Sequence, residues 1–182
     1  MHDTVLVVDQ AIRLRAWRPD DLEALLRHAD DAEVSRGTSD RFPFPYTRDD
    51  GLAFLSGRVL DLSGPVFAIE LVGQACGGIG ATVLAGERAI GAEVGYWLGR
   101  AHWGRGIMTR VLAAFGPWLV ARHGLLRLEA TVLDFNHGSA RVLEKNGFEE
   151  EGRLRCAVRK RGRLHDLRVF GRVLAPSPPA RA

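Results

Sequence analysis

A glycine-rich turn, Trp103-Gly104-Arg105-Gly106, stands where a strand pattern changes into a helix pattern. The first amides of a helix have no partner within the helix, and the helix dipole is positive at that end. Two glycines allow an anion to come close to the main chain, so we predict a diphosphate site with Arg105 near enough to add charge. A tight strand-to-helix turn without a ligand is the alternative interpretation. The turn is neither a dinucleotide fingerprint, because Thr109 replaces the third glycine, nor a P-loop.

A second turn of this kind follows another predicted strand, at Asn136-His137-Gly138-Ser139. Asn136 or Ser139 is the expected N-cap of the helix that begins there, and Gly147 is expected to end that helix in the left-handed conformation. Neighbouring parallel strands end at one edge of a sheet, where the ligands of open sheets bind. We therefore expect the two turns to serve one ligand site, although capping alone would also explain the second.

For three further side chains, the neighbouring residues in the sequence indicate whether each is structural or reactive. Tyr96 shares a strand face with Val94 and Leu98, so alternation predicts a core residue. Histidine can transfer protons near neutral pH, but at position 137 we expect an exposed side chain in the first turn of a helix. Cys76 has no evident base beside it and is expected to be a small strand residue rather than a nucleophile.

The elements that must position these residues follow from apolar periodicity and from turn residues. The sequence predicts strands over 12–17, 66–71, 78–84, 89–98, 126–133, 148–153 and 164–174, and helices from Pro19, from Thr47 to about Leu60, over 106–122 and over 139–146. Residues 30–46 are expected to form a long loop, and Pro117 to kink or break the third helix near Ala113. The fold class is α+β (mixed α/β) in one domain.

Length and composition agree with a single globular domain. The 182 residues are 46% apolar and 26% charged, which is close to the average for such domains. We predict one domain over 11–174, an N-terminal extension over 1–10, and a disordered proline-rich tail over 175–182.

Apolar run length, the N-terminal pattern and cysteine spacing argue against several classes of protein. No apolar run approaches the ~18–20 residues of a membrane span, so no membrane partner is expected. The segment Met1–Thr4 lacks the pattern of a secretory signal, and we expect a cytoplasmic protein. Cys76 and Cys156 have no metal-ligand spacing, so no metal is expected.

Charge is distributed unevenly along the chain. Residues 19–50 hold nine acidic and four basic side chains, whereas residues 153–172 hold eight basic side chains and one acidic. Arginines make up 23 of the 25 basic residues, which indicates codon bias and gives arginine richness little functional weight. The basic segment could meet a phosphate-bearing ligand or RNA, although a solvated strand face is the preferred interpretation and nucleic acid is not an expected partner.

Taken together, these motifs resemble the GNAT superfamily of acetyl-CoA-dependent N-acetyltransferases, and more closely its RimJ/RimL-type branch of ribosomal-protein N-terminal acetyltransferases. The resemblance covers residues 11–174 and rests on Arg13-Leu14-Arg15, Trp17-Arg18, Asp20, Glu93 to Leu98, Trp103 to Gly106, Asn136, Ser139, Leu143-Glu144-Lys145, Gly147-Phe148 and Glu151-Gly152. Met108 departs from the pattern, since glycine or alanine is usual there. The resemblance implies a twisted, mostly antiparallel sheet of about seven strands with a splayed parallel pair, flanked by about four helices.

The resemblance also implies a site for acetyl-CoA as co-substrate. The main chain of Trp97 and Leu98 would pair with the pantetheine arm, and Asn136 would donate a hydrogen bond to it. Ser139 would stand near the thioester sulfur and protonate the leaving thiolate. Glu93 would act as the base through water, with a salt-bridged strand carboxylate as the alternative. The pyrophosphate would lie on Trp103, Gly104, Arg105, Gly106, Ile107, Met108 and Thr109.

The implied reaction is direct transfer of an acetyl group to a primary amine in a ternary complex, by proximity and by oxyanion stabilisation from strand amides. A protein N-terminal α-amine is the first acceptor, and a small amine such as an amino acid or an aminoglycoside-like molecule is the alternative. We expect the acceptor site in the acidic 19–50 region, which includes the aromatic Phe42–Tyr46 loop. Two other hypotheses are an acyl-CoA sensor without turnover and an RNA- or ribosome-binding module. A homodimer is a candidate assembly.

Overall fold

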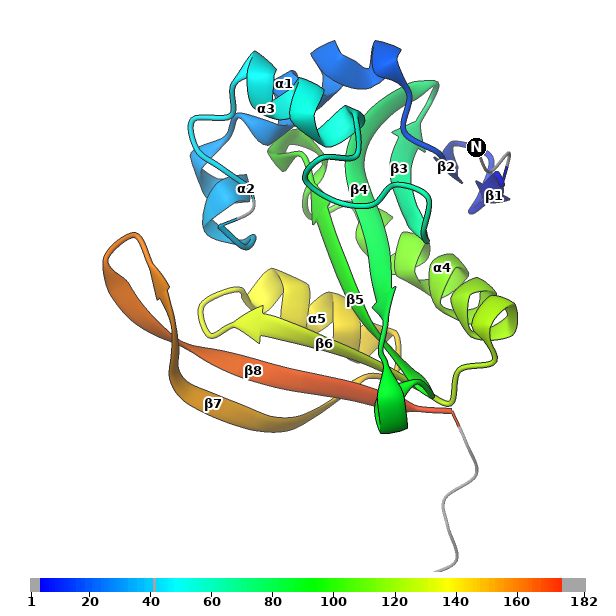
Figure 1. The fold of residues 1–182 in the computed structure, drawn as a ribbon, viewed down its shortest axis with the longest axis vertical. Helices are drawn as coiled ribbons and strands as arrows, with labels where there is room; N and C mark the ends of the chain where they lie inside the picture. Colours follow the sequence, from blue (N-terminus) through cyan, green and yellow to red (C-terminus); the bar gives the residue numbers. More distant parts are fainter. Residues whose placement is uncertain (1–3, 41, 175–182) are drawn as a thin grey trace, which may run out of the picture.

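An eight-stranded sheet runs through the computed structural model, which describes residues 4–40 and 42–174 (Figure 1). In spatial order the strands are β1 (Leu6–Val7), β2 (Ile12–Arg15), β3 (Val66–Leu71), β4 (Gln74–Val83), β5 (Gly91–Leu98), β6 (Arg127–Leu133), β8 (Arg163–Val173) and β7 (Glu149–Lys160). All neighbours are antiparallel except β5 and β6. The predicted mixed sheet is confirmed, with one strand more than expected because residues of the predicted N-terminal extension supply β1.

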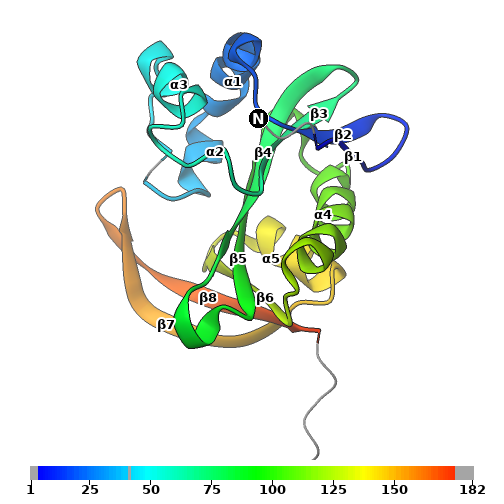
Figure 2. The same cartoon turned by 45° about the vertical axis from the view of Figure 1, so that its right-hand side comes forward.

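β5 and β6 are the splayed parallel pair. They are paired only from Gly91 opposite Arg127 to Glu93 opposite Glu129. Beyond these positions β5 continues to pair with β4 as far as Leu98, while β6 stays with β8. A gap therefore opens between the C-terminal ends of β5 and β6, as Figures 1 and 2 show.

Helices cover both faces of the sheet (Figure 2). They are α1 (Leu22–Ala29), α2 (Ala32–Arg36), α3 (Arg48–Leu55), α4 (Ile107–His123) and α5 (His137–Lys145). The larger core packs α4 and α5 against the sheet and includes Phe115 and Val94, whereas the smaller core lies beneath α1 and α3 and includes Tyr46 and Trp97. β5 therefore presents Val94 to one core and Trp97 to the other, as the alternation of a strand requires.

Two predicted helix features need correction, and one of the two alternatives at Pro117 is excluded. Residues 32–36 form α2 inside the expected long loop, because the Asp31 carboxylate accepts hydrogen bonds from the first amides of that helix. α3 ends at Leu55 rather than near Leu60, and Gly57 then turns the chain with a φ of 77°. α4 runs through Pro117 without the break that we allowed for. The first two features depend on single side chains or short segments, which carry little periodicity.

β7 and β8 form a hairpin that extends well past the strand end predicted at Arg153. β7 reaches Lys160, and a turn at Arg161 and Gly162 leads into β8. Most of β7 is exposed on both faces, so its sequence lacks the apolar alternation by which a strand is recognised. The hairpin carries the basic segment, and its tip extends toward α2 (Figure 1).

Two expectations concern the rest of the chain. The predicted disordered tail over 175–182 lies outside the described residues. Among the helices of the described part, none combines the length and the apolar character that a bilayer crossing requires.

Candidate active site

The glycine turn predicted at Trp103–Gly106 forms the N-terminal end of α4. Gly104 and Gly106 have φ angles of 72° and 68°, in the left-handed region that glycine adopts without strain. A Cβ at either position would meet no atom within 4 Å, so the space in front of the turn is open. The Arg110 N–H donates to the Gly106 carbonyl (3.2 Å), and the preceding amides of Ile107–Thr109 are those that an α-helix leaves unpaired. The turn therefore has the geometry of an anion site.

Trp103 holds this turn against the end of β5. Its indole N–H donates to the Leu98 carbonyl (2.7 Å), although the residue as a whole is 46% exposed. Arg105 is exposed at the turn, so a positive charge is available next to the open amides.

The main-chain groups of β5 alternate between β4 and the gap. The Gly99 N–H donates to the Cys76 carbonyl of β4 (2.8 Å), so the alternation of an antiparallel ladder directs the main chain of Trp97 toward β4 as well. The groups that face the gap therefore belong to Tyr96 and Leu98. We expected Trp97 and Leu98 to pair with an extended ligand, but the register favours Tyr96 and Leu98.

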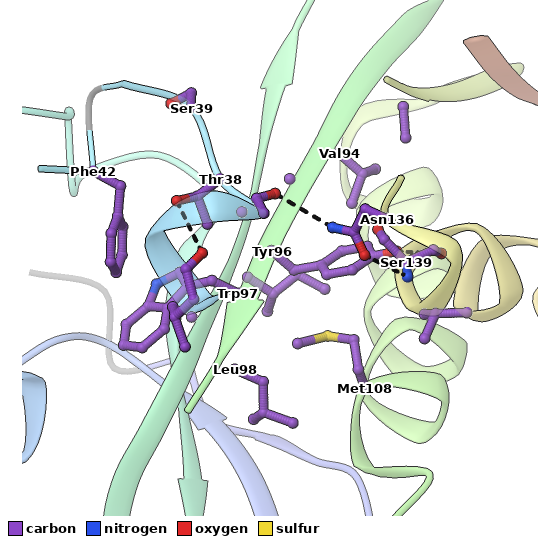
Figure 3. Close-up of a pocket in the computed structure, with 18 of the residues that line it drawn as sticks. Thr38, Ser39, Phe42, Val94, Tyr96, Trp97, Leu98, Met108, Asn136 and Ser139 are labelled. Atoms are coloured by element: carbon purple, nitrogen blue, oxygen red, sulfur yellow. Dashed lines mark hydrogen bonds between the residues drawn. The ribbon is translucent and has the colours of Figure 1, made fainter. Parts of the chain in front are cut away.

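α5 begins beside the gap with Asn136 as its N-cap. The Asn136 side-chain oxygen accepts a hydrogen bond from the Ser139 N–H (3.1 Å), and its amide donates to the Gly37 carbonyl (3.4 Å) (Figure 3). Of the two capping residues that we considered, Asn136 is the cap, which leaves the Ser139 hydroxyl free for another role. At the other end of α5, Asn146 donates to the Thr109 carbonyl (3.2 Å) and joins the helix to the first turn of α4.

Ser139 and Tyr96 face each other across the gap (Figure 3). The Ser139 hydroxyl donates to the Tyr96 phenol oxygen (3.0 Å), and the Tyr96 hydroxyl donates to the Ser139 carbonyl (3.1 Å). Burial raises the pKa of Tyr96 to about 12, so the phenol is protonated at neutral pH. Alternation predicted a core residue at Tyr96, and the ring does pack against the larger core. Its hydroxyl nevertheless belongs to the site, which sequence reasoning missed because only the splay exposes it.

Glu93 lies on the opposite face of β5 from Tyr96. Its side chain is exposed, lines the same cavity, and accepts a hydrogen bond from the Thr131 hydroxyl of β6 (3.3 Å). The arginines close to this part of the sheet, Arg88 and Arg127, pair instead with Glu129. The structure therefore favours a carboxylate that faces the cavity over the salt-bridged strand carboxylate that we considered.

A cavity of about 1210 Å³ connects these features. It is lined by the turn before α4, the gap-facing end of β5, the start of α5 and the loop after α2. All the site residues implied by the resemblance line it except Arg105, which is exposed beside it. The volume exceeds the ~300–1,000 Å³ of a typical ligand pocket, so there is room for an extended ligand and a second molecule.

Four aromatic side chains wall the part of the cavity beneath α1 and α3, and we call Trp17, Phe42, Phe54 and Trp97 the aromatic wall. Trp17 and Trp97 are stacked with ring centroids 6.4 Å apart. Phe54 meets Trp17 edge-on at 5.2 Å, and Phe42 meets Trp97 at 5.1 Å. The predicted Phe42–Tyr46 loop thus borders the cavity on its apolar side.

The tip of the β7–β8 hairpin closes over this loop. Lys160 is only 6% exposed, and its ammonium donates to the Asp40 carboxylate (2.7 Å). Arg161 donates to the Ala32 carbonyl (2.8 Å) and lies over the Phe44 ring at 5.5 Å. We call these contacts the hairpin clasp. Because Lys160 and Asp40 are 120 residues apart in the sequence, no local pattern predicts their contact.

Cys76 and three histidines lie close to the site, and His102 and His137 line the cavity. Cys76 is buried, and burial raises its thiol pKa to about 11, as expected of a small strand residue. His137 is exposed in the first turn of α5, as predicted. The rings of His28 and His102 are 5.1 Å apart, and burial lowers the pKa of both. Within residues 4–40 and 42–174, no group of three or more His, Cys, Asp or Glu side chains is placed to hold a metal ion.

Comparison with known proteins gives three findings. A family model described as an acetyltransferase (GNAT) domain matches residues 11–149. A probable N-acetyltransferase, YjcK from Bacillus subtilis (strain 168), is 42% identical over 79 residues, which are 43% of this chain and 44% of that protein. The match therefore spans less than half of the relative's length.

Two solved structures share the fold. The acetyltransferase (GNAT family) from Bacillus anthracis superposes with a TM-score of 0.81 at 19% identity, over 93% of this chain and 98% of the other. RimL, the ribosomal L7/L12 alpha-N-protein acetyltransferase in complex with coenzyme A, gives a TM-score of 0.81 at 21% identity, over 94% and 98%. At these identities the likeness concerns the fold alone.

Proposed function

Because this chain belongs to the GNAT acetyltransferase family, we propose that it transfers the acetyl group of acetyl-CoA to a primary amine. One observation carries this proposal: an anion turn, an unpaired strand edge and a hydroxyl pair follow one another along a single cavity. That order matches the order of a diphosphate, an extended arm and a thioester along one ligand.

Each part of acetyl-CoA has a partner in this order. The pyrophosphate would lie on the open amides from Trp103 to Thr109, with Arg105 adding charge. The pantetheine arm would pair with the gap-facing main chain of Tyr96 and with the Leu98 N–H, since the Leu98 carbonyl accepts from the Trp103 indole. The Asn136 side-chain N–H donates a long hydrogen bond of 3.4 Å to the Gly37 carbonyl, and the arm would offer this N–H another acceptor while the side-chain oxygen keeps the cap of α5. The fit rests on the open space at Gly104 and Gly106 and on the gap itself.

Ser139 and Glu93 would each move one proton of the reaction. The ammonium form of the acceptor would first lose a proton to Glu93 through water, because only the free amine has a lone pair with which to attack the acetyl carbonyl carbon. After the attack the nitrogen loses its second proton to solvent as the amide forms. When the carbon–sulfur bond breaks, the Ser139 hydroxyl would protonate the thiolate, and the protonated Tyr96 phenol beside it can return a proton to Ser139. Negative charge that develops on the carbonyl oxygen would be stabilised by N–H groups of β5 that face the gap.

For the acceptor we propose a peptide or protein N-terminal α-amine, with a small amine as the alternative. The acidic 19–50 segment supplies Glu33, Asp40 and Asp50 to the cavity lining, and Glu93 adds a fourth carboxylate. Glu33 pairs with Arg36 and Asp40 pairs with Lys160, so Asp50 and Glu93 are the carboxylates of this set that would attract a cationic amine before it is deprotonated. We expect it to enter from this side because the α4 turn occupies the other.

The test is incubation of the protein with acetyl-CoA and a panel of N-terminal peptides and small amines, followed by mass spectrometry and an assay of released thiol. A mass gain of one acetyl group on an amine, with equimolar thiol, is the expected result. Tight binding of acetyl-CoA without thiol release for any amine would instead identify a sensor and refute the proposed function.

A further inference from the structure

We propose that the acceptor amine carries a bulky apolar or aromatic group on the carbon next to its nitrogen. This inference rests on the acetyl transfer proposed above and names the class of acceptor. It follows from three neighbouring parts of the cavity on the Glu93 face of β5: a bare floor, the aromatic wall and a carboxylate.

The floor is made of glycines. On this face of the sheet Gly95 of β5 stands directly opposite Gly80 of β4. A Cβ at Gly95 would meet nothing within 4 Å, so the space above this residue is open to the cavity that Gly95 and Gly80 both line. Val66, which also lines the cavity, covers Gly80 with a methyl group 3.1 Å from where its Cβ would be. The floor is therefore apolar as well as open.

The aromatic wall rises at one end of this floor. Trp97 follows Gly95 by two residues on the same face, and its indole lies over Gly78, where a Cβ would be 2.8 Å from the indole nitrogen. Trp17, Phe42 and Phe54 extend the wall, and all four rings are partly exposed. When an apolar group of the ligand covers exposed aromatic surface in a concave site, removal of that surface from water contributes favourable binding free energy.

The carboxylate of Glu93 stands at the other end. Glu93 precedes Gly95 by two residues, so the Cα atoms of Glu93 and Trp97 are about 13 Å apart with the open floor midway between them. A molecule on the floor can thus place an ammonium toward Glu93 and a ring or a branched alkyl group toward Trp97. An acceptor whose first carbon carries only a hydrogen or a hydroxymethyl group would leave the wall uncovered.

The selectivity test uses tetrapeptides that differ only in their first residue, namely Phe, Leu, Ala or Ser. A second arm compares 2-phenylethylamine with ethylamine, which separates a peptide from a small amine as the source of the apolar group. Thiol release under chemistry-limited conditions gives kcat/KM for each. We expect Phe and Leu to exceed Ala and Ser by about 10-fold or more, because burial of several carbon atoms is lost with the small side chains.

Two variants locate the preference in the structure. Phe42→Ala should reduce the ratio of Phe to Ser peptide turnover, because it removes part of the wall. Gly95→Leu should fill the floor and abolish turnover of the Phe peptide while the acetyl-CoA thermal shift persists, which also shows that the variant folds. Gly152→Leu is the matched control, since a Cβ at this β7 glycine also meets nothing within 4 Å and the residue does not line the cavity.

The outcomes separate this inference from the proposed function. Thiol release with no preference, or with a preference for Ser or Ala, overturns the acceptor class and leaves acetyl transfer intact. Normal turnover by Gly95→Leu likewise overturns the placement of the acceptor above Gly95. Failure of every amine to release thiol refutes the proposed function itself, and the acceptor class with it.

Discussion

Replacement of Ser139 by alanine is the most informative test of the proposed chemistry. The substitution removes one hydroxyl, whose described hydrogen bond goes to the Tyr96 phenol at 3.0 Å. Loss of one such bond costs about 0.5–1.5 kcal/mol of folding free energy. The cap of α5 is unaffected, because Asn136 and not Ser139 supplies it. The variant should therefore fold and bind acetyl-CoA with nearly unchanged affinity.

The expected effect of Ser139→Ala lies in the rate constant. Protonation of the departing thiolate matters only in and after the transition state, so kcat and kcat/KM should fall together. General acid catalysis contributes typically ~10²–10⁴-fold, and water entering the space left by the hydroxyl would place the loss at the lower end. Single-turnover kinetics with a saturating amine measure the chemical step without product release.

Tyr96→Phe completes a double-mutant cycle with Ser139→Ala. If the two hydroxyls act as a unit, the tyrosine variant alone should lower the rate, and the double variant should be hardly slower than Ser139→Ala; a coupling of ~0.5–3 kcal/mol is typical of residues in contact. Full turnover by Ser139→Ala, with chemistry shown to limit the rate, would refute the role of Ser139 and leave it a helix-surface residue. Strictly additive losses would refute the coupling alone.

Four further predictions test the proposed anion turn before α4, the proposed base and two structural features. Gly104→Val should abolish the rise in melting temperature that we expect from acetyl-CoA, since the ligand binds the folded state. Gly86→Val should keep this rise, because Gly86 also has a positive φ and open space around it. An equal loss of the rise in both variants would point to backbone strain. Glu93→Gln should slow turnover at neutral pH, and the rate should recover toward pH ~9, where more of the acceptor is present as the free amine without help from a base. An unchanged pH profile would show that Glu93 has a structural role. Arg15→Met breaks an ion pair whose side chains are each 6% exposed and should cost about 3–5 kcal/mol in urea unfolding; a change below 1 kcal/mol would contradict this. Burial lowers the pKa of His28 in the folded state. The unfolded chain therefore binds the proton more readily than the folded chain, and the melting temperature should fall as the pH drops below ~6.5. In His28→Gln this fall should be shallower, and an identical fall would exclude His28 as its cause.

Local features of the fold could be predicted from the sequence, and long-range ones could not. The glycine turn before α4 and the cap of α5 depend on residues close together in the chain, so their spacing predicted the turn and narrowed the cap to Asn136 or Ser139. The role of Tyr96 was missed because alternation places a side chain on a face but does not show where two strands part. The hairpin clasp joins Asp40 to Lys160, which are far apart in the sequence, so no local pattern predicted it. The C-terminal half of β7 was missed because its sequence has no apolar alternation. The aromatic wall likewise depends on how separate segments meet, although its Phe42–Tyr46 part was expected near the acceptor.

The hairpin clasp also bears on the order in which the parts of the site can form during synthesis. During synthesis, the residues of the anion turn and of the Ser139–Tyr96 pair leave the ribosome before Lys160 and Arg161, which hold the loop between α2 and α3. A chain that had folded only its earlier part would leave the loop that carries Phe42 without its partner. The loop on the acceptor side therefore reaches its described position only after the C-terminal strands have been made.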